Sequence, residues 1–141
     1  MTTTTAKKTA ASANGVEKTP LQMLLAKRNN KRTLKLYIED EDGEKQEISL
    51  TFTSIGSKAY DKLVSKHPPT AEQRLDGATY NPDTFAPALV SVCMTDPEIT
   101  EAQAKQLWTS ETWSRGDLMA MFGTAVGVNN QGSDIPFTER D

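Results

Sequence analysis

Two segments in the first half of the chain alternate apolar and polar side chains with a period of two. The apolar positions are Leu34, Leu36 and Ile38 in the first segment and Ile48, Leu50 and Phe52 in the second. This period indicates strands that each bury one face, and the Asp42-Gly43 pair between them favours a tight turn. We therefore predict a β-hairpin over residues 33–52. No third strand is evident, so a partner subunit is a natural candidate for pairing the edges of the hairpin.

After the hairpin, residues 54–130 show the spacing of amphipathic helices, and one short helix is predicted before the hairpin. Residues suited to capping precede the apolar segments: Thr19, Ser54, Thr70, Thr84, Thr100 and Ser114. For the helix that begins near residue 82, Asn81 is the alternative cap. It would leave Pro87 in the helix interior at a cost of about 3 kcal/mol, so we predict that Thr84 is the cap.

These elements predict an α+β domain in which the hairpin packs against four to five short helices. A chain of 141 residues has room for one such domain, which we place at residues 19–130. A basic arm over residues 1–18 has almost nothing to bury and is expected to be disordered. The polar residues 131–141 are expected to form a flexible tail. Apolar stretches stay below the roughly 18 residues that a membrane span needs, so no membrane partner is predicted.

Charge is distributed unevenly along the chain. Residues 1–35 contain eight Lys or Arg and one acidic residue, which gives a net charge of +7. Residues 36–141 contain eight Lys or Arg and eighteen Asp or Glu, which gives a net charge of −10. The cations of the first part cluster at Lys27, Arg28, Lys31, Arg32 and Lys35. Several cations together can bind phosphates, but few aromatic residues are there to stack on bases. We therefore expect this cluster to contact an acidic protein surface, such as that of a neighbouring copy, rather than nucleic acid.

Residue types that carry catalysis are sparse. One cysteine, Cys93, and one histidine, His67, cannot form a Cys/His metal cluster, and phosphate-binding and dinucleotide-binding motifs are missing. We expect Cys93 to be buried as a small apolar residue and His67 to lie at a helix end. The acidic residues at 39–47 lack the spacing of a calcium loop and are interpreted as a solvated turn, with a contact for a basic partner as the alternative. No catalytic residue, cofactor or metal is predicted.

The last predicted helix is the strongest candidate for a binding surface. Its expected apolar stripe is Leu118, Phe122, Ala125 and Val126, and Trp113 lies just before it. Tryptophan at such a place either closes the core or anchors an interface. Met119 and Met121 cannot face the same way, so at least one should be partly exposed. We predict that Trp113, Leu118 and Phe122 contribute to partner binding.

Several short motifs occur in a recognisable order between Tyr60 and Asn130. They are His67-Pro68-Pro69-Thr70, Tyr80-Asn81-Pro82-Asp83-Thr84-Phe85-Ala86-Pro87-Ala88-Leu89, Asp96-Pro97 and Trp113-Ser114-Arg115-Gly116-Asp117. In this order they resemble the tail assembly chaperones of long-tailed bacteriophages with non-contractile tails. The resemblance covers about half of the chain, and the basic arm and the hairpin lie outside it.

The resemblance implies a non-enzymatic protein that acts in the cytoplasm of the infected host. Such chaperones bind the tape measure protein, help recruit tail tube subunits and leave before the virion is complete. The family has a short form and a frameshifted longer form, and this chain would be the short one. A homo-oligomer is expected for this class. The alternative is a structural virion protein, such as a head–tail connector or a tail completion protein.

Overall fold

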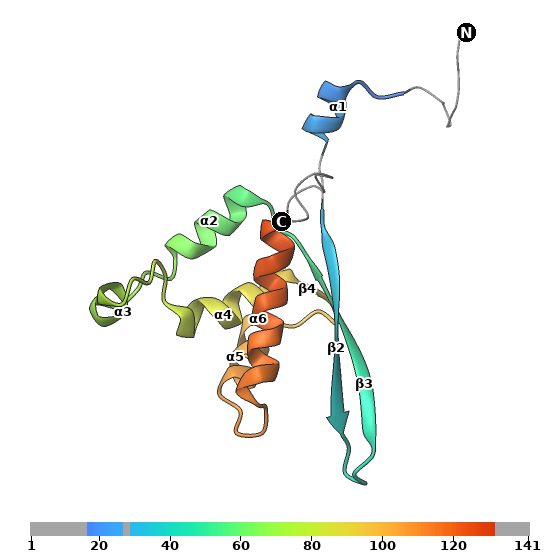
Figure 1. The fold of residues 1–141 in the computed structure, drawn as a ribbon, viewed down its shortest axis with the longest axis vertical. Helices are drawn as coiled ribbons and strands as arrows, with labels where there is room; N and C mark the ends of the chain where they lie inside the picture. The colour runs from blue at the N-terminus through green and yellow to red at the C-terminus, as the bar shows by residue number, and fades with distance from the viewer. Residues whose placement is uncertain (1–16, 27–28, 132–141) are drawn as a thin grey trace, which may run out of the picture.

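The two long strands precede most of the helices in the computed structural model, which describes residues 17–26 and 29–131. In chain order the elements are α1 (Pro20–Leu25), β2 (Lys31–Glu39), β3 (Lys45–Thr53), α2 (Ser57–Ser65), α3 (Ala71–Leu75), α4 (Pro82–Cys93), β4 (Met94–Asp96), α5 (Glu101–Trp108) and α6 (Arg115–Asn130). Helices α2 to α6 lie on one side of the hairpin (Figure 1). The fold is α+β, as the sequence predicts, with six helices among the described residues rather than four or five. Most of the predicted arm, the predicted tail beyond residue 131, and Lys27 and Arg28 lie outside the described residues.

The predicted hairpin is present and is longer than the sequence pattern indicates. β2 and β3 pair antiparallel from Lys31 opposite Thr53 to Glu39 opposite Lys45. The turn is closed by a hydrogen bond from the Asp40 N–H to the Glu44 carbonyl, at 2.8 Å. Gly43 has a φ of 80°, in the left-handed region that a three-residue hairpin loop requires and that glycine adopts without strain.

A third strand corrects the prediction that none is present. β4 pairs antiparallel with the end of β3, and the sheet order is β2-β3-β4. The Thr95 and Thr53 hydroxyls lie 2.9 Å apart across this pair. The strand escapes the sequence pattern because it has three residues, follows directly on the buried helix α4 and is too short for an alternation to develop.

Most helix starts follow the predicted capping residues, and two do not. Thr19, Thr70 and Thr100 each form a capping box with the glutamine three residues later, and the Ser114 hydroxyl accepts from the Asp117 N–H. The prediction of Ser54 as a cap is wrong, because α2 begins after Gly56 and Ser54 instead continues the hairpin. The Ser54 N–H donates to the Asn30 carbonyl, at 2.9 Å.

The prediction of Thr84 as the cap of α4 is also wrong. Asn81 is the cap, its side chain accepts from the Asp83 N–H at 3.0 Å, and Pro87 lies inside the helix. The structure tolerates the backbone donor lost at Pro87 because this part of α4 is the centre of the core. Every residue from Phe85 to Val90 is buried, so apolar burial of several kcal/mol offsets the cost of about 3 kcal/mol.

The core lies between α4, α6 and one face of the sheet. Its largest fully buried side chains are Phe52, Phe85, Leu89, Met121, Val90 and Val128, together with Cys93. Near the end of α4, Cys93 is fully buried, whereas Val92 is 49 % exposed. Along α6 the buried residues are Leu118, Met121, Ala125 and Val128, so the predicted stripe is right at two of its four positions and Phe122 and Val126 are only half-buried.

Candidate functional site

The three side chains predicted to bind a partner do not form one surface. Leu118 is 8 % exposed and belongs to the core, so it is inaccessible to a partner in this conformation. Phe122 is half-buried and packs edge-to-face on Phe85, with ring centroids 6.0 Å apart. Trp113, also half-buried, lies before α6 and faces the hairpin instead.

Trp113 lines a cavity between the end of β2 and the start of α6. The other lining residues are Tyr37, Ile38, Glu39, Thr112 and Asp117, and the cavity volume is about 350 Å³. Two aromatic and two acidic residues are among the lining residues. Because successive side chains of a strand point to opposite faces, the Tyr37 and Glu39 side chains lie on the face of β2 opposite to that of Ile38. Of the three predicted residues, only Trp113 contributes to this cavity.

Sequence reasoning missed Tyr37 and Asp117 as parts of this cavity. Tyr37 lies on the polar face of β2, is 65 % exposed, and its hydroxyl lies 3.3 Å from a Glu47 carboxylate oxygen. Asp117 was assigned to the start of the last helix, where its N–H is capped by Ser114. A signal for Tyr37 exists, because it is a large aromatic residue at an outward position of an alternating strand.

The described part of the basic cluster lies at the opposite end of β2. The Arg32 Nε donates to the Gln131 Oε1 at 3.1 Å, and its guanidinium lies against Gly127 of α6. Lys35 forms an exposed ion pair with Glu47 at 3.9 Å. Lys31 and Lys35 share the outer face of β2, whereas Arg32 points to α6, so the described cations do not form one patch. Lys27 and Arg28 lie outside the described residues.

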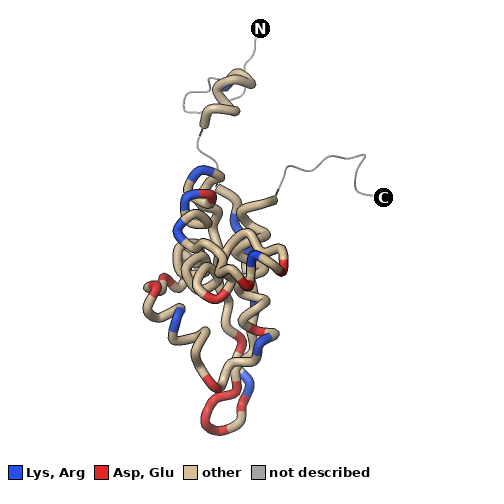
Figure 2. The backbone as a smooth tube through the Cα atoms, turned by 90° about the vertical axis from the view of Figure 1, so that its left-hand side faces the viewer, with Lys and Arg blue, Asp and Glu red and all other residues tan. Residues whose placement is uncertain are grey.

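The acidic turn binds its own backbone. The Asp40 Oδ1 accepts from the N–H groups of Asp42 and Glu44, at 2.9 and 3.0 Å, and its Oδ2 accepts from the Gln46 Nε2 at 3.1 Å. These hydrogen bonds, above all the one from Gln46, lower the pKa of the Asp40 carboxyl. Within the part of the chain that the structure describes, no three Cys, His, Asp or Glu side chains gather as metal ligands. Figure 2 shows the acidic residues concentrated at the hairpin turn, at one end of the molecule.

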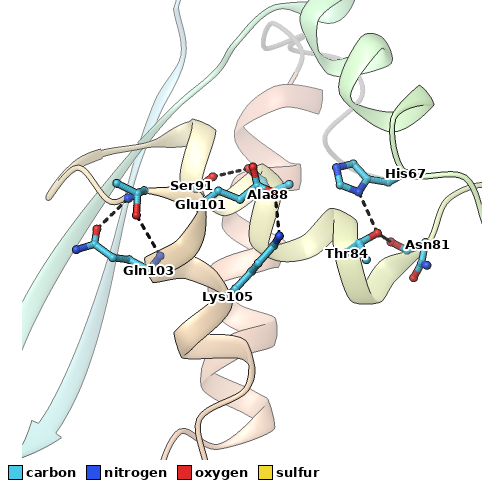
Figure 3. Close-up of polar contacts among 9 residues, drawn as sticks. His67, Asn81, Thr84, Ala88, Ser91, Glu101, Gln103 and Lys105 are labelled. Atoms are coloured by element: carbon cyan, nitrogen blue, oxygen red, sulfur yellow. Dashed lines mark hydrogen bonds and ion pairs between the residues drawn. The ribbon is translucent and has the colours of Figure 1, made fainter.

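His67 and Cys93 occupy structural positions. The His67 ring packs against Phe85. The His67 Nδ1 lies 2.9 Å from the Thr84 hydroxyl (Figure 3). His67 lies just after α2, as predicted, and this bond ties the end of α2 to the start of α4. Cys93 is fully buried, as predicted, and burial raises the pKa of its thiol, an effect that a hydrogen bond from Asn129 partly opposes. A buried thiol with a raised pKa is a poor nucleophile at neutral pH.

Asn129 holds three segments together, a role that its sequence position does not reveal. Its Oδ1 accepts from the Ile55 N–H at 2.8 Å, and its Nδ2 donates to the Ala125 carbonyl at 2.7 Å and lies 3.1 Å from the Cys93 Sγ. Since Ile55 lies in the segment between β3 and α2, this side chain joins α6 to both the hairpin segment and α4. From the sequence, an asparagine near the end of a helix is expected only to end that helix, so its contacts with distant segments are not predicted.

Comparisons with known proteins add no assignment to this arrangement. No protein-family model matches the chain. No curated protein and no solved structure matches it either. Over residues 17–26 and 29–131, none of the helices is long and apolar enough to span a bilayer.

Proposed function

We propose that this protein is a tail assembly chaperone of a long-tailed bacteriophage, which binds the tape measure protein and keeps it soluble while the tail forms. The proposal rests on the order of motifs between Tyr60 and Asn130 and on the exposed apolar side chains of α1. In this proposal the protein has no catalytic role, acts in the host cytoplasm, assists the addition of tail tube subunits and leaves before the virion is complete.

The exposed leucines of helix α1 give the proposal its strongest structural support. Leu21, Leu24 and Leu25 are 63, 76 and 76 % exposed, and no residue of the helix is buried. The helix is nevertheless well defined at its start, because Thr19 and Gln22 cap each other's backbone N–H groups at 3.1 and 2.7 Å. Three exposed leucines on a preformed turn suit contact with the apolar face of a partner helix.

The net charge of the chain after the basic cluster fits the same role. A chaperone that exposes apolar side chains needs charge elsewhere to stay dispersed, and residues 36–141 carry a net charge of −10. Acidic side chains populate the hairpin turn and the helical surface, whereas the apolar helix α1 carries no charged residue (Figure 2). In this proposal α1 makes the apolar contact with the partner, and the acidic residues elsewhere keep the complexes apart by repulsion.

Co-expression with the tape measure protein of the same phage tests the proposal. We expect the tape measure protein to be recovered in the soluble fraction as a complex with this chain, and to be insoluble when expressed alone. If the tape measure protein is insoluble in both cases and no complex is recovered, the proposed function is wrong. Antibody staining of purified virions gives a second test, because stoichiometric presence there would favour the alternative of a structural virion protein.

A double variant locates the binding surface. Leu24→Ser with Leu25→Ser removes the two most exposed leucines of α1 while leaving its capping residues and the core intact, so the variant should fold normally and bind the tape measure protein more weakly. Leu75→Ser is the matched control, because Leu75 is an equally exposed leucine, at 88 %, on the short helix α3. If both variants retain the complex, α1 is not the binding surface, and the function must be assigned to other residues.

A further inference from the structure

Strand β2 is an edge strand over its whole length. The sheet order is β2-β3-β4, so in the part of the chain that the structure describes β2 has a neighbouring strand on one side only. β4 is short and pairs with Thr51 and Phe52, which leaves β2 as the longest open edge of the described sheet. A nine-residue edge of this kind is a template for pairing with another strand.

The hydrogen bonds at the two ends of the hairpin define which backbone groups point outward. Asn30 pairs with Ser54 and Asp40 pairs with Glu44 through backbone hydrogen bonds at 2.9 and 2.8 Å. In an antiparallel ladder, bonded pairs alternate, so the even-numbered residues of β2 bond to β3. The odd-numbered residues direct their N–H and C=O groups away from β3. They are Lys31, Thr33, Lys35, Tyr37 and Glu39, and all five are exposed.

The side chains of β2 make this edge complementary to itself when two copies are related by a two-fold axis. The strand begins with Lys31 and Arg32 and ends at Glu39, with Asp40 directly after it. Antiparallel pairing of two copies places the basic start of each strand beside the acidic end of the other. Opposite charges across a strand pair stabilise it, and like charges destabilise it.

Charge also disfavours one register, the one centred on Lys35. With Lys35 opposite Lys35, two cations would meet at the centre of the pair. A shift of one residue in the position of the axis places Leu36 opposite Leu36, Lys35 opposite Tyr37 and Arg32 opposite Asp40. In this register the odd-numbered residues still bond to one another, the ammonium of Lys35 approaches an exposed aromatic ring, and no like charges face each other.

We propose that β2 pairs antiparallel with β2 of a second copy of this chain, with Leu36 opposite Leu36, so that one sheet continues through a two-fold dimer. Charge complementarity supports this choice of occupant, because the register places Arg32 of each strand opposite Asp40 of the other. The proposal concerns this chain alone and is independent of the proposed binding of the tape measure protein.

The mass of the purified full chain in solution, measured by light scattering and sedimentation, is the first test. We expect the wild-type chain to be a dimer. Thr33→Pro removes an outward N–H and leaves the ladder with β3 intact, because the Thr33 N–H points away from β3. Two hydrogen bonds are lost per dimer, so its association constant should fall roughly ten- to hundredfold. The matched control, Thr33→Ala, keeps the N–H and should remain dimeric. A monomeric wild-type chain, or equal association of the two variants, would overturn the proposal.

Cysteine cross-linking tests the register and remains informative if Thr33→Pro unfolds. Paired residues that exchange hydrogen bonds have Cα atoms about 5.5 Å apart, within the range that a disulfide spans. A mixture of Lys35→Cys and Tyr37→Cys chains should therefore form a mixed disulfide on mild oxidation. Cys93 does not interfere, since it is fully buried. Cross-linking of Lys35→Cys with itself in preference to the mixture would overturn the register, and no cross-link in either case would overturn the pairing.

Discussion

Replacing Phe122 by alanine tests whether this residue stabilises the core or binds a partner. The sequence predicts that Phe122 binds a partner, whereas the structure shows it packed against other aromatic rings. The Phe122 ring packs edge-to-face on Phe85 at 6.0 Å and on Tyr80 at 6.5 Å. Each such pair contributes about 0.5–1.5 kcal/mol beyond the area that it buries. A fully buried phenylalanine costs about 3–5 kcal/mol when cut back to alanine, so the half-buried Phe122 should cost about 2–3 kcal/mol.

Urea denaturation followed by tryptophan fluorescence measures this loss, because Trp108 and Trp113 both pack against the core. A domain of this size has a stability of about 5–15 kcal/mol, so Phe122→Ala should stay folded at 25 °C and melt roughly 8–12 °C lower. Met119→Ala on the same helix is the control. Met119 is 41 % exposed, and its loss should change the stability by no more than about 0.5 kcal/mol.

The packing argument fails if Phe122→Ala loses less than about 1 kcal/mol, because two edge-to-face contacts would then contribute almost nothing. Binding is measured on the same variant at a temperature well below its melting point. A folded Phe122→Ala chain that still captures the tape measure protein would assign Phe122 to packing alone. A folded chain that has lost the complex would restore the sequence-based prediction that Phe122 contacts the partner.

Three further predictions concern stability and titration. Gly123→Ala should stabilise α6 by about 1 kcal/mol in urea denaturation, since no atom lies within 4 Å of the added Cβ. Gly127→Ala should stabilise it less, because the added Cβ meets the Arg32 guanidinium. Equal stabilisation by the two substitutions would contradict the contact between Arg32 and Gly127. Cys93 should react with a thiol reagent at the rate of unfolding, and fast labelling of the native chain would exclude burial. The contribution of the Cys93 thiol to stability should be complete below its unfolded pKa of about 8.5 and should decline as the pH rises through its raised folded pKa. Asp40, whose folded pKa is lowered, should stabilise the hairpin above about pH 4 and lose this effect as the pH falls through the folded value. A carboxyl NMR titration of the wild-type chain that finds the Asp40 pKa at or above its ordinary value would refute this.

Local chemistry made much of the fold predictable. Period-two alternation identified both strands of the hairpin, and three Thr–Gln capping boxes marked the starts of α1, α3 and α5, because each signal depends on residues close together in the chain. Interactions between distant residues were not predictable in this way. Pro87 disfavours a helix that begins at Pro82, because it then lies in the helix interior. Burial of the surrounding residues by the rest of the domain offsets this cost.

The candidate site was less predictable for the same reason. Trp113 was identified because tryptophan before a helix is suited to an interface, but its neighbours Tyr37 and Glu39 come from a strand more than 70 residues away. Leu118 and Phe122 were assigned to a binding surface from their spacing alone. Spacing defines which residues share a helix face, and it does not say whether that face meets the core or a partner.

The burial of every residue from Phe85 to Val90 in α4 has a consequence for synthesis of the chain. The helices that cover it, α5 and α6, follow it in sequence, so Phe85 to Val90 leave the ribosome before their cover exists. At about 5–20 residues per second, this apolar helix waits roughly 2–7 s until Asn130 has been added. During that interval the nascent chain exposes a strongly apolar segment, and cellular chaperones that bind nascent chains are expected to contact it there.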